Sequence, residues 1–261
     1  MQIVKIGNHT IEFYDTIEEL PIVRFHKYEK LLLVDSGVGS DIHSLDQRLL
    51  KVREFLAAGK PEQAQKELEN LRQCVFMIQN ELSPKHRAFA ALVTKIDGQD
   101  CNNLSDDALA AVTEKLNDVP RKELTAQLEA VKKKIDDELL LYFPALFNDS
   151  SVKEYYDLMR KRTLALLKEI VDGAKDPGAS DAVAKLTTAL ITYANPKLFT
   201  GSDGVEIQFD RQFENLCLVL SEQLNVEPKK YSVLEFYNAF EFVKERAKHT
   251  EKAQKRPNFQ R

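Results

Sequence analysis

Apolar residues that recur at alternating intervals of four and three are the feature of this sequence that most constrains its fold. From residue 64 to residue 82 the intervals are 4, 3, 4, 3 and 4, and similar spacing precedes them between residues 45 and 56. Such spacing places the apolar side chains on one narrow face of an α-helix, which predicts helices that pack along that face. The positions are Leu45, Leu49, Val52 and Leu56 in the first stretch, and Ala64, Leu68, Leu71, Val75, Ile78 and Leu82 in the second.

The short segment between these two stretches favours a turn. In the sequence AAGKP, Gly59 can end one helix and Pro61 can occupy the first turn of the next. We therefore expect an antiparallel helical hairpin with arms of about 30 Å, because an α-helix rises about 1.5 Å per residue. Residues 121 to 143 repeat the apolar pattern, at Leu124, Leu128, Val131, Ile135, Leu139 and Tyr142.

The rest of the chain contains one β-hairpin pattern and several helical patterns. Apolar and polar residues alternate on both sides of Gly7-Asn8, which predicts two short strands and no larger sheet. A helix is expected from Ile22, since the apolar stretch that follows is too long for a strand. Further helices are expected over residues 83–96, 105–116, 151–172, 180–194, 207–225 and 232–250, with Ser83, Ser105 and Ser232 as N-caps.

The predicted fold is therefore mainly α, a helical bundle with long antiparallel helical hairpins and a small N-terminal β-hairpin. We expect its parts to follow one another along the chain. These are a hairpin-plus-helix module at 1–39, helical hairpins at 40–173, a C-terminal helical region at 174–250 and a basic tail at 251–261.

Composition limits the classes of function. The 261 residues include 37 Lys and Arg against 41 Asp and Glu, so no basic excess indicates binding to nucleic acid. Cys74, Cys101 and Cys217 are far apart and form neither a zinc motif nor a disulfide framework, which favours a reducing compartment. No run of about 18 apolar residues and no secretion signal is present, so we expect neither membrane insertion nor export.

The stretch VDSGVGSD, residues 34 to 41, raises the question of a phosphate-binding loop. Such loops follow a strand and use further glycines or a lysine, whereas this stretch has only two glycines and neither addition. We expect Gly37 to end one helix in a left-handed cap and Ser40 to begin the next, with Asp41 near its N-terminus. A nucleotide-binding or nucleic-acid-processing enzyme that uses this loop stays open as an alternative.

No other pattern indicates catalysis or metal binding. The five histidines are scattered, and the acidic run from Asp97 to Asp107 lacks the spacing of a calcium loop. No local nucleophile motif occurs. We therefore expect a protein that is not an enzyme, with no catalytic residues, no cofactor and no metal.

The most distinctive segment lies near the C-terminus. In YSVLEFYNAFEFVKERAKH the apolar and aromatic residues form one wide helix face, which requires either the chain's own core or a partner to cover it. The segment after it is polar and basic. The predicted partner-binding residues are Phe236, Tyr237, Phe240, Val243, Lys255, Arg256 and Phe259.

Two segments resemble proteins of tailed phages. The sequence IEFYDTIEELPIVRFHKYEKLLLVDSGVGSDI resembles N-terminal segments of uncharacterised proteins from tailed phages and prophages of gut Bacteroidales. The sequence YSVLEFYNAFEFVKE is similar to short helices of phage tail-assembly chaperones. The two resemblances cover about thirty and about fifteen residues, and the middle of the chain contributes none.

These resemblances imply a role in phage morphogenesis. The leading expectation is a virion structural protein of the head-to-tail connector or tail region, which binds other phage structural or tail proteins and forms a homo-oligomer. It would be found in the virion, or in the host cytoplasm during assembly, without direct contact with nucleic acid. The alternatives are a tail-assembly chaperone and a helical adaptor of the host.

Overall fold

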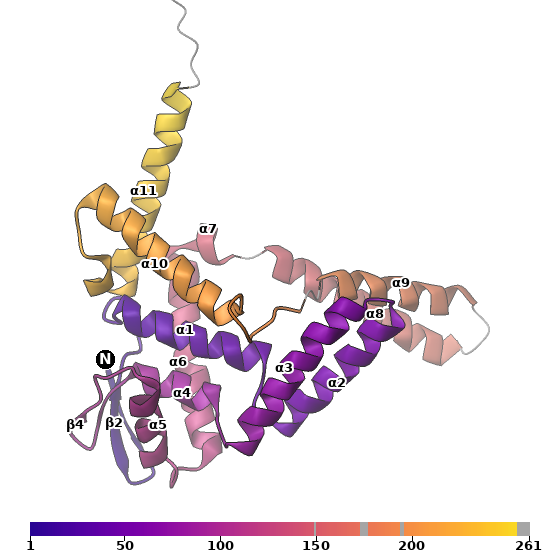
Figure 1. The fold of residues 1–261 in the computed structure, drawn as a ribbon, viewed down its shortest axis with the longest axis horizontal. Helices are drawn as coiled ribbons and strands as arrows, with labels where there is room; N and C mark the ends of the chain where they lie inside the picture. Colours follow the sequence, from indigo (N-terminus) through magenta and orange to yellow (C-terminus); the bar gives the residue numbers. More distant parts are fainter. Residues whose placement is uncertain (149, 173–176, 194–195, 255–261) are drawn as a thin grey trace, which may run out of the picture. The chain divides into compact units, whose positions relative to one another are not determined.

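The structure is a computed structural model that describes residues 1–148, 150–172, 177–193 and 196–254 (Figure 1). Its fold is mainly α with an N-terminal β-hairpin, as the sequence predicted. The chain divides into two compact units rather than into consecutive segments, because parts of each unit are separated in sequence by the other. Unit 1 consists of Met1–Ser36, Ser83–Phe143 and Glu206–Arg261, and unit 2 of Gly37–Leu82 and Pro144–Val205.

The sheet of unit 1 is larger than expected. In the described chain it has four antiparallel strands in the order β1 (Gln2–Ile6), β2 (His9–Phe13), β3 (Val93–Ile96) and β4 (Gln99–Asp100). The prediction of two strands and no larger sheet was therefore wrong. On one face, Ile11 pairs with Ile96 and both side chains are buried.

The added strands replace the end of a predicted helix. The helix expected over residues 83–96 ends earlier, as α4 (Pro84–Leu92), with Ser83 as its N-cap. The β-branched residues Val93, Thr94 and Ile96 favour a strand after it. Asp97 and Gly98 then both have positive φ angles, 50° and 79°, which suits the tight turn into β4.

The helices of unit 1 pack on this sheet and on one another. The seam predicted in α6 is confirmed at Leu124, Leu128, Val131, Ile135 and Leu139, all of which are buried, while Tyr142 is exposed. The helices of this unit include α1 (Ile22–Gly37), α4, α5 (Asp106–Lys115), α6 (Arg121–Tyr142), α10 (Val205–Leu224), the 3-10 turn η2 (Pro228–Lys230) and α11 (Val233–Gln254).

The start of α11 is joined to the segment before α1 by backbone hydrogen bonds. The amide of Ile22 donates to the carbonyl of Tyr231, and the amide of Val233 donates to the carbonyl of Leu20, both at 2.9 Å. Ser232 caps the helix as predicted, because its hydroxyl accepts from the amide of Glu235. The first turn of α11 therefore belongs to the core of unit 1.

Unit 2 is built from helical hairpins. The predicted hairpin is confirmed as α2 (Ile42–Ala57) and α3 (Pro61–Gln79), joined by a turn in which Gly59 has a φ of 66°. Unit 2 also contains α7 (Pro144–Phe147) and a second hairpin of α8 (Ser150–Asp172) and α9 (Pro177–Tyr193) (Figure 1).

The seam of the α2–α3 hairpin differs from the predicted one. Leu49, Leu56 and Leu68 are exposed, although the heptad spacing had placed them inside. The buried positions are Arg48, Val52 and Phe55 on α2, and Ala64, Glu67, Asn70 and Cys74 on α3.

Candidate functional site

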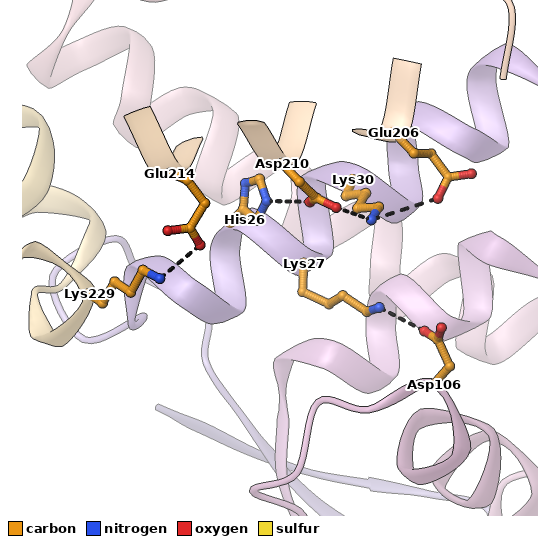
Figure 2. A network of polar contacts seen from close by, with 8 residues as sticks. All are labelled: His26, Lys27, Lys30, Asp106, Glu206, Asp210, Glu214 and Lys229. Atoms are coloured by element: carbon orange, nitrogen blue, oxygen red, sulfur yellow. Dashed lines mark hydrogen bonds and ion pairs between the residues drawn. The ribbon is translucent and has the colours of Figure 1, made fainter. Parts of the chain in front are cut away.

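A network of polar contacts joins α10 to α1 within unit 1 (Figure 2). The His26 ring on α1 lies between the rings of Phe209 and Phe213 on α10, with centroids 4.6 and 4.1 Å away and planes nearly parallel. Nε2 of His26 lies 2.9 Å from Oδ1 of Asp210 (Figure 2). The imidazole is therefore held by two stacked rings and one carboxylate.

Lysines pair with the carboxylates around this histidine. The ammonium of Lys30 donates to Asp210 at 2.6 Å and lies 3.8 Å from Glu206. Each remaining carboxylate in Figure 2 also has a cationic partner. These further pairs are Lys27 with Asp106 at 2.7 Å and Lys229 with Glu214 at 2.8 Å.

The pKa values in this network follow from burial and pairing. Burial lowers the pKa of His26 and outweighs the opposing effect of Asp210, so the imidazole is neutral at neutral pH. Burial alone would raise the pKa of Asp210, but hydrogen bonds from Lys30 and His26 together lower it. Burial raises the pKa of Glu206.

An Asp–His pair can act as a general base, but it also needs a nucleophile at the second ring nitrogen. Within the described chain His26 makes one side-chain hydrogen bond, to Asp210. Both faces of its ring are covered by phenylalanine. The arrangement therefore attaches α10 to α1.

A second histidine connects three loops at the edge of the sheet in unit 1. His9 lies at the β1–β2 turn, with Nδ1 2.7 Å from Asp97 and Nε2 3.0 Å from Asp118. Ionised carboxylates only accept hydrogen bonds, so both ring nitrogens must donate, which requires the protonated imidazolium. The hydrogen bonds that His9 donates to Asp97 and Asp118 accordingly raise the pKa of His9.

One carboxylate between α1 and α6 also has a shifted pKa. Burial is the main cause that raises the pKa of Glu29 to about 7, and the nearby charge of Asp136 raises it further. Lys132 acts in the opposite direction. Glu29 is therefore partly protonated near neutral pH.

Unit 2 contains a buried polar network. The guanidinium of Arg48 donates to Glu67 at 2.7 Å, to the carbonyl of Val38 at 2.5 Å and to the carbonyl of Gly37. Asn70 donates to the carbonyl of Lys197 at 2.8 Å and accepts from the amide of Phe199 at 3.3 Å. Nδ2 of Asn70 also donates to Oε2 of Glu67 at 3.4 Å. The network therefore connects α2 and α3 to two segments of irregular backbone.

The loop over residues 34–41 forms part of this network and does not have the structure of a phosphate-binding loop. Residues 34–37 belong to the helix α1 and do not follow a strand, and the carbonyls of Gly37 and Val38 accept from Arg48. The left-handed residue is Gly39, with a φ of 78°, and not Gly37, which lies within α1. The N-cap of α2 is Asp41 rather than Ser40, because the Asp41 carboxylate accepts from the amide of Ser44 at 2.7 Å.

Gly37 is required here for close packing and not for its φ angle. A Cβ at this position would lie 1.8 Å from Cζ of Phe199. The ring of Phe199 therefore occupies the space next to the backbone of Gly37.

The described residues offer no group of three or more His, Cys, Asp and Glu side chains that could hold a metal ion. The three cysteines are free, with Cys74 and Cys217 buried and Cys101 half-buried. No helix among the described residues has both the length and the apolar character needed to cross a membrane.

The predicted partner-binding residues are divided by the structure. Phe236 is 1% exposed and packs against the ring of Phe213, so in this conformation it lies in the core and not on the surface. Tyr237, Phe240 and Val243 are half-buried, and their contact with a partner stays a prediction. Lys255, Arg256 and Phe259 lie outside the described residues.

Sequence reasoning missed two groups of exposed apolar residues in unit 2. On α8 they are Met159, Leu164, Leu167 and Ile170, and on α2 they are Ile42, Leu49, Leu50 and Leu56. The spacing of seven from Ile42 to Leu49 to Leu56 was a signal in the sequence, but Leu49 and Leu56 were assigned to an internal seam and Ile42 was not considered. No protein-family model, curated protein or solved structure matches this chain.

Proposed function

We propose that the protein is a non-enzymatic structural component of a tailed-phage particle, in the head-to-tail connector or tail region, that binds its neighbours through helix faces. The observation that carries this proposal is the exposed apolar side of α8 in unit 2. Met159, Leu164, Leu167 and Ile170 are 40%, 56%, 53% and 76% exposed. Their spacing places them on one side of the helix.

An apolar helix side of this kind favours a protein partner. Each square ångström of apolar surface removed from water contributes about 25 cal/mol. Contiguous apolar surface on a soluble protein commonly marks an interaction site. The phage setting comes from the resemblance of the N-terminal segment and of the α11 sequence to phage proteins.

A tail-assembly chaperone is the second candidate. Phe242 on α11 is 57% exposed, on the helix whose sequence is similar to those chaperones. A chaperone would bind tail proteins before assembly and would be absent from the finished particle. The enzymatic alternative has less support, because residues 34–37 belong to α1, whereas a phosphate-binding loop follows a strand.

Mass spectrometry of purified particles tests the proposal. Particles from the phage or prophage that encodes the chain are expected to contain it in a fixed ratio to the other structural proteins. Replacing Leu164 and Leu167 together by Ser should reduce its incorporation about tenfold or more, because two apolar contacts contribute about 1–3 kcal/mol and 1.4 kcal/mol is tenfold.

Lys161→Ser on the same helix is the matched control, since Lys161 is exposed and not apolar. It should leave incorporation unchanged. If the chain is found in infected cells but not in particles, the chaperone role replaces the virion role as the proposed function. Equal incorporation of the leucine double variant and the wild type would show that the apolar side of α8 is not the binding surface.

A further inference from the structure

The outer side of α2 in unit 2 has a regular apolar stripe. Ile42, Leu49 and Leu56 are 71%, 49% and 59% exposed and lie at intervals of seven residues. A seven-residue step drifts only about 20° around a helix, so the three side chains form a nearly straight line about 21 Å long. Leu50, at 58% exposed, flanks the middle of this line. We call these four residues the α2 stripe.

The stripe is not used by the hairpin that contains it. The side of α2 that packs in the hairpin presents Val52 and Phe55, which form a buried cluster with Ala64 of α3. Arg48 is buried on that same side. The α2 stripe lies next to this face and outside it, so the described chain leaves it uncovered.

Two opposite charges lie along the stripe. Asp46 and Arg53 are both exposed, are seven residues apart and lie on the same side of the helix as the stripe. Neither makes an ion pair with another residue that the structure describes. Asp46 lies about one helical turn before the midpoint of the stripe, and Arg53 lies about one turn after it.

We infer that the α2 stripe is the contact between two copies of this chain, with their α2 helices packed antiparallel about a two-fold axis near Leu49 and Leu50. A two-fold contact brings the same surface of both copies together, so that surface must be complementary to itself. Antiparallel packing brings Asp46 of each copy within reach of Arg53 of the other and places Ile42 near Leu56. The leucines at the midpoint face their own counterparts.

Charge selects this direction over the parallel one. Parallel packing would place Asp46 next to the second Asp46, and Arg53 next to the second Arg53. Like charges in an interface are unfavourable, whereas opposite charges fix the register and the direction of pairing. The sequence of charges along α2 therefore matches a second copy of the same helix.

The size of the contact sets the expected strength. One helix from each copy buries less than the roughly 1,600 Å² of a standard interface. Such small interfaces are weak, so we expect a dimer that dissociates in the micromolar range. Added salt should weaken the dimer, because it screens the two charge pairs.

Sedimentation velocity of the full chain across the micromolar range tests the inference. The wild type should change from monomer to dimer with rising concentration, and Leu49→Lys should stay monomeric. Asp46→Arg and Arg53→Asp should each weaken self-association at least about tenfold, because each creates two like-charge contacts. An equimolar mixture of these two variants should form a dimer, since every charge contact in the mixed dimer is again between opposite charges.

Leu68→Lys is the matched control, because Leu68 is an exposed leucine on α3 and lies outside the stripe. It should dimerise like the wild type. Far-UV circular dichroism verifies that each variant keeps its helices. A wild type that stays monomeric throughout, or a dimer that Leu49→Lys leaves intact, would overturn the inference. The inference does not depend on the proposed function, since a chain absent from phage particles could still dimerise in this way.

Discussion

Replacing Arg48 by Met tests whether the buried polar network organises unit 2. In the wild type the guanidinium donates to Glu67 and to the carbonyls of Val38 and Gly37. Glu67 is 2% exposed, and without Arg48 its remaining side-chain partner in the wild-type arrangement is Asn70, at 3.4 Å. A buried carboxylate with so little compensation is costly.

The magnitude follows from the burial of both partners. Removing one member of a buried ion pair destabilises a protein by about 3–5 kcal/mol. That is a large part of the about 5–15 kcal/mol that holds a typical domain folded. The double variant Arg48→Met with Glu67→Leu also removes the stranded charge, so its cost should be at least about 2 kcal/mol below the sum of the two single costs.

Hydrogen exchange measured by mass spectrometry is the suitable assay, because it reports each unit separately. Amides of α2 and α3 should lose protection in Arg48→Met and regain part of it in the double variant. Peptides from α6 in unit 1 provide an internal control and should be unchanged. Glu67→Gln, which keeps an oxygen to accept from Arg48, should cost less than Glu67→Leu.

Two results would refute this reasoning. If the single costs simply add in the double variant, Arg48 and Glu67 do not depend on each other. If Arg48→Met removes protection equally from α2 and α6, the network does not act within unit 2 alone.

Two further predictions concern single residues. His9→Gln should lower the free energy of unfolding below about pH 6.5, because the stabilising form is the imidazolium between Asp97 and Asp118. This difference should vanish as the pH rises through the raised pKa of His9. Urea unfolding at several pH values measures the difference, and a difference that does not change with pH would contradict the prediction. Gly37→Ala should destabilise unit 2 by about 1–3 kcal/mol through overlap with the Phe199 ring, although alanine favours helix by about 1 kcal/mol. In a Phe199→Ala background the same change should be neutral or stabilising, and thermal unfolding would contradict the packing argument if Gly37→Ala remained as harmful there.

The sequence predicted some helix seams and not others, and the difference lies in what covers them. In α6 the heptad residues from Leu124 to Leu139 face an apolar core, so spacing alone identified them. In α2 and α3 the buried face contains Arg48, Glu67 and Asn70. Hydrophobic spacing assigns such residues to the surface.

The missing information for that hairpin lies far away in the chain. Asn70 and Glu67 can be buried because their partners include Arg48 and the backbone at Lys197 and Phe199, more than one hundred residues after Asn70. A local pattern does not contain those partners. The same holds for the discontinuous units, whose segments are joined only by folding.

The β3–β4 hairpin was a different kind of error, because its signal was local. Asp97-Gly98 is a common pair in tight hairpin turns, and β-branched residues precede it. Residues 83–96 had instead been predicted to form one helix capped by Ser83. The turn residues Asp97 and Gly98 should have been used to place a hairpin there.

The interrupted order of the two units has a consequence during synthesis. All of unit 2 is translated by Val205, whereas unit 1 still lacks α10 and α11. At about 5–20 residues per second, the ribosome needs about 2–10 s more to complete α11. During that interval Phe25 and His26 lack the α10 and α11 rings that pack against them, so the nascent chain exposes an aromatic surface to which folding chaperones and unrelated nascent chains can bind.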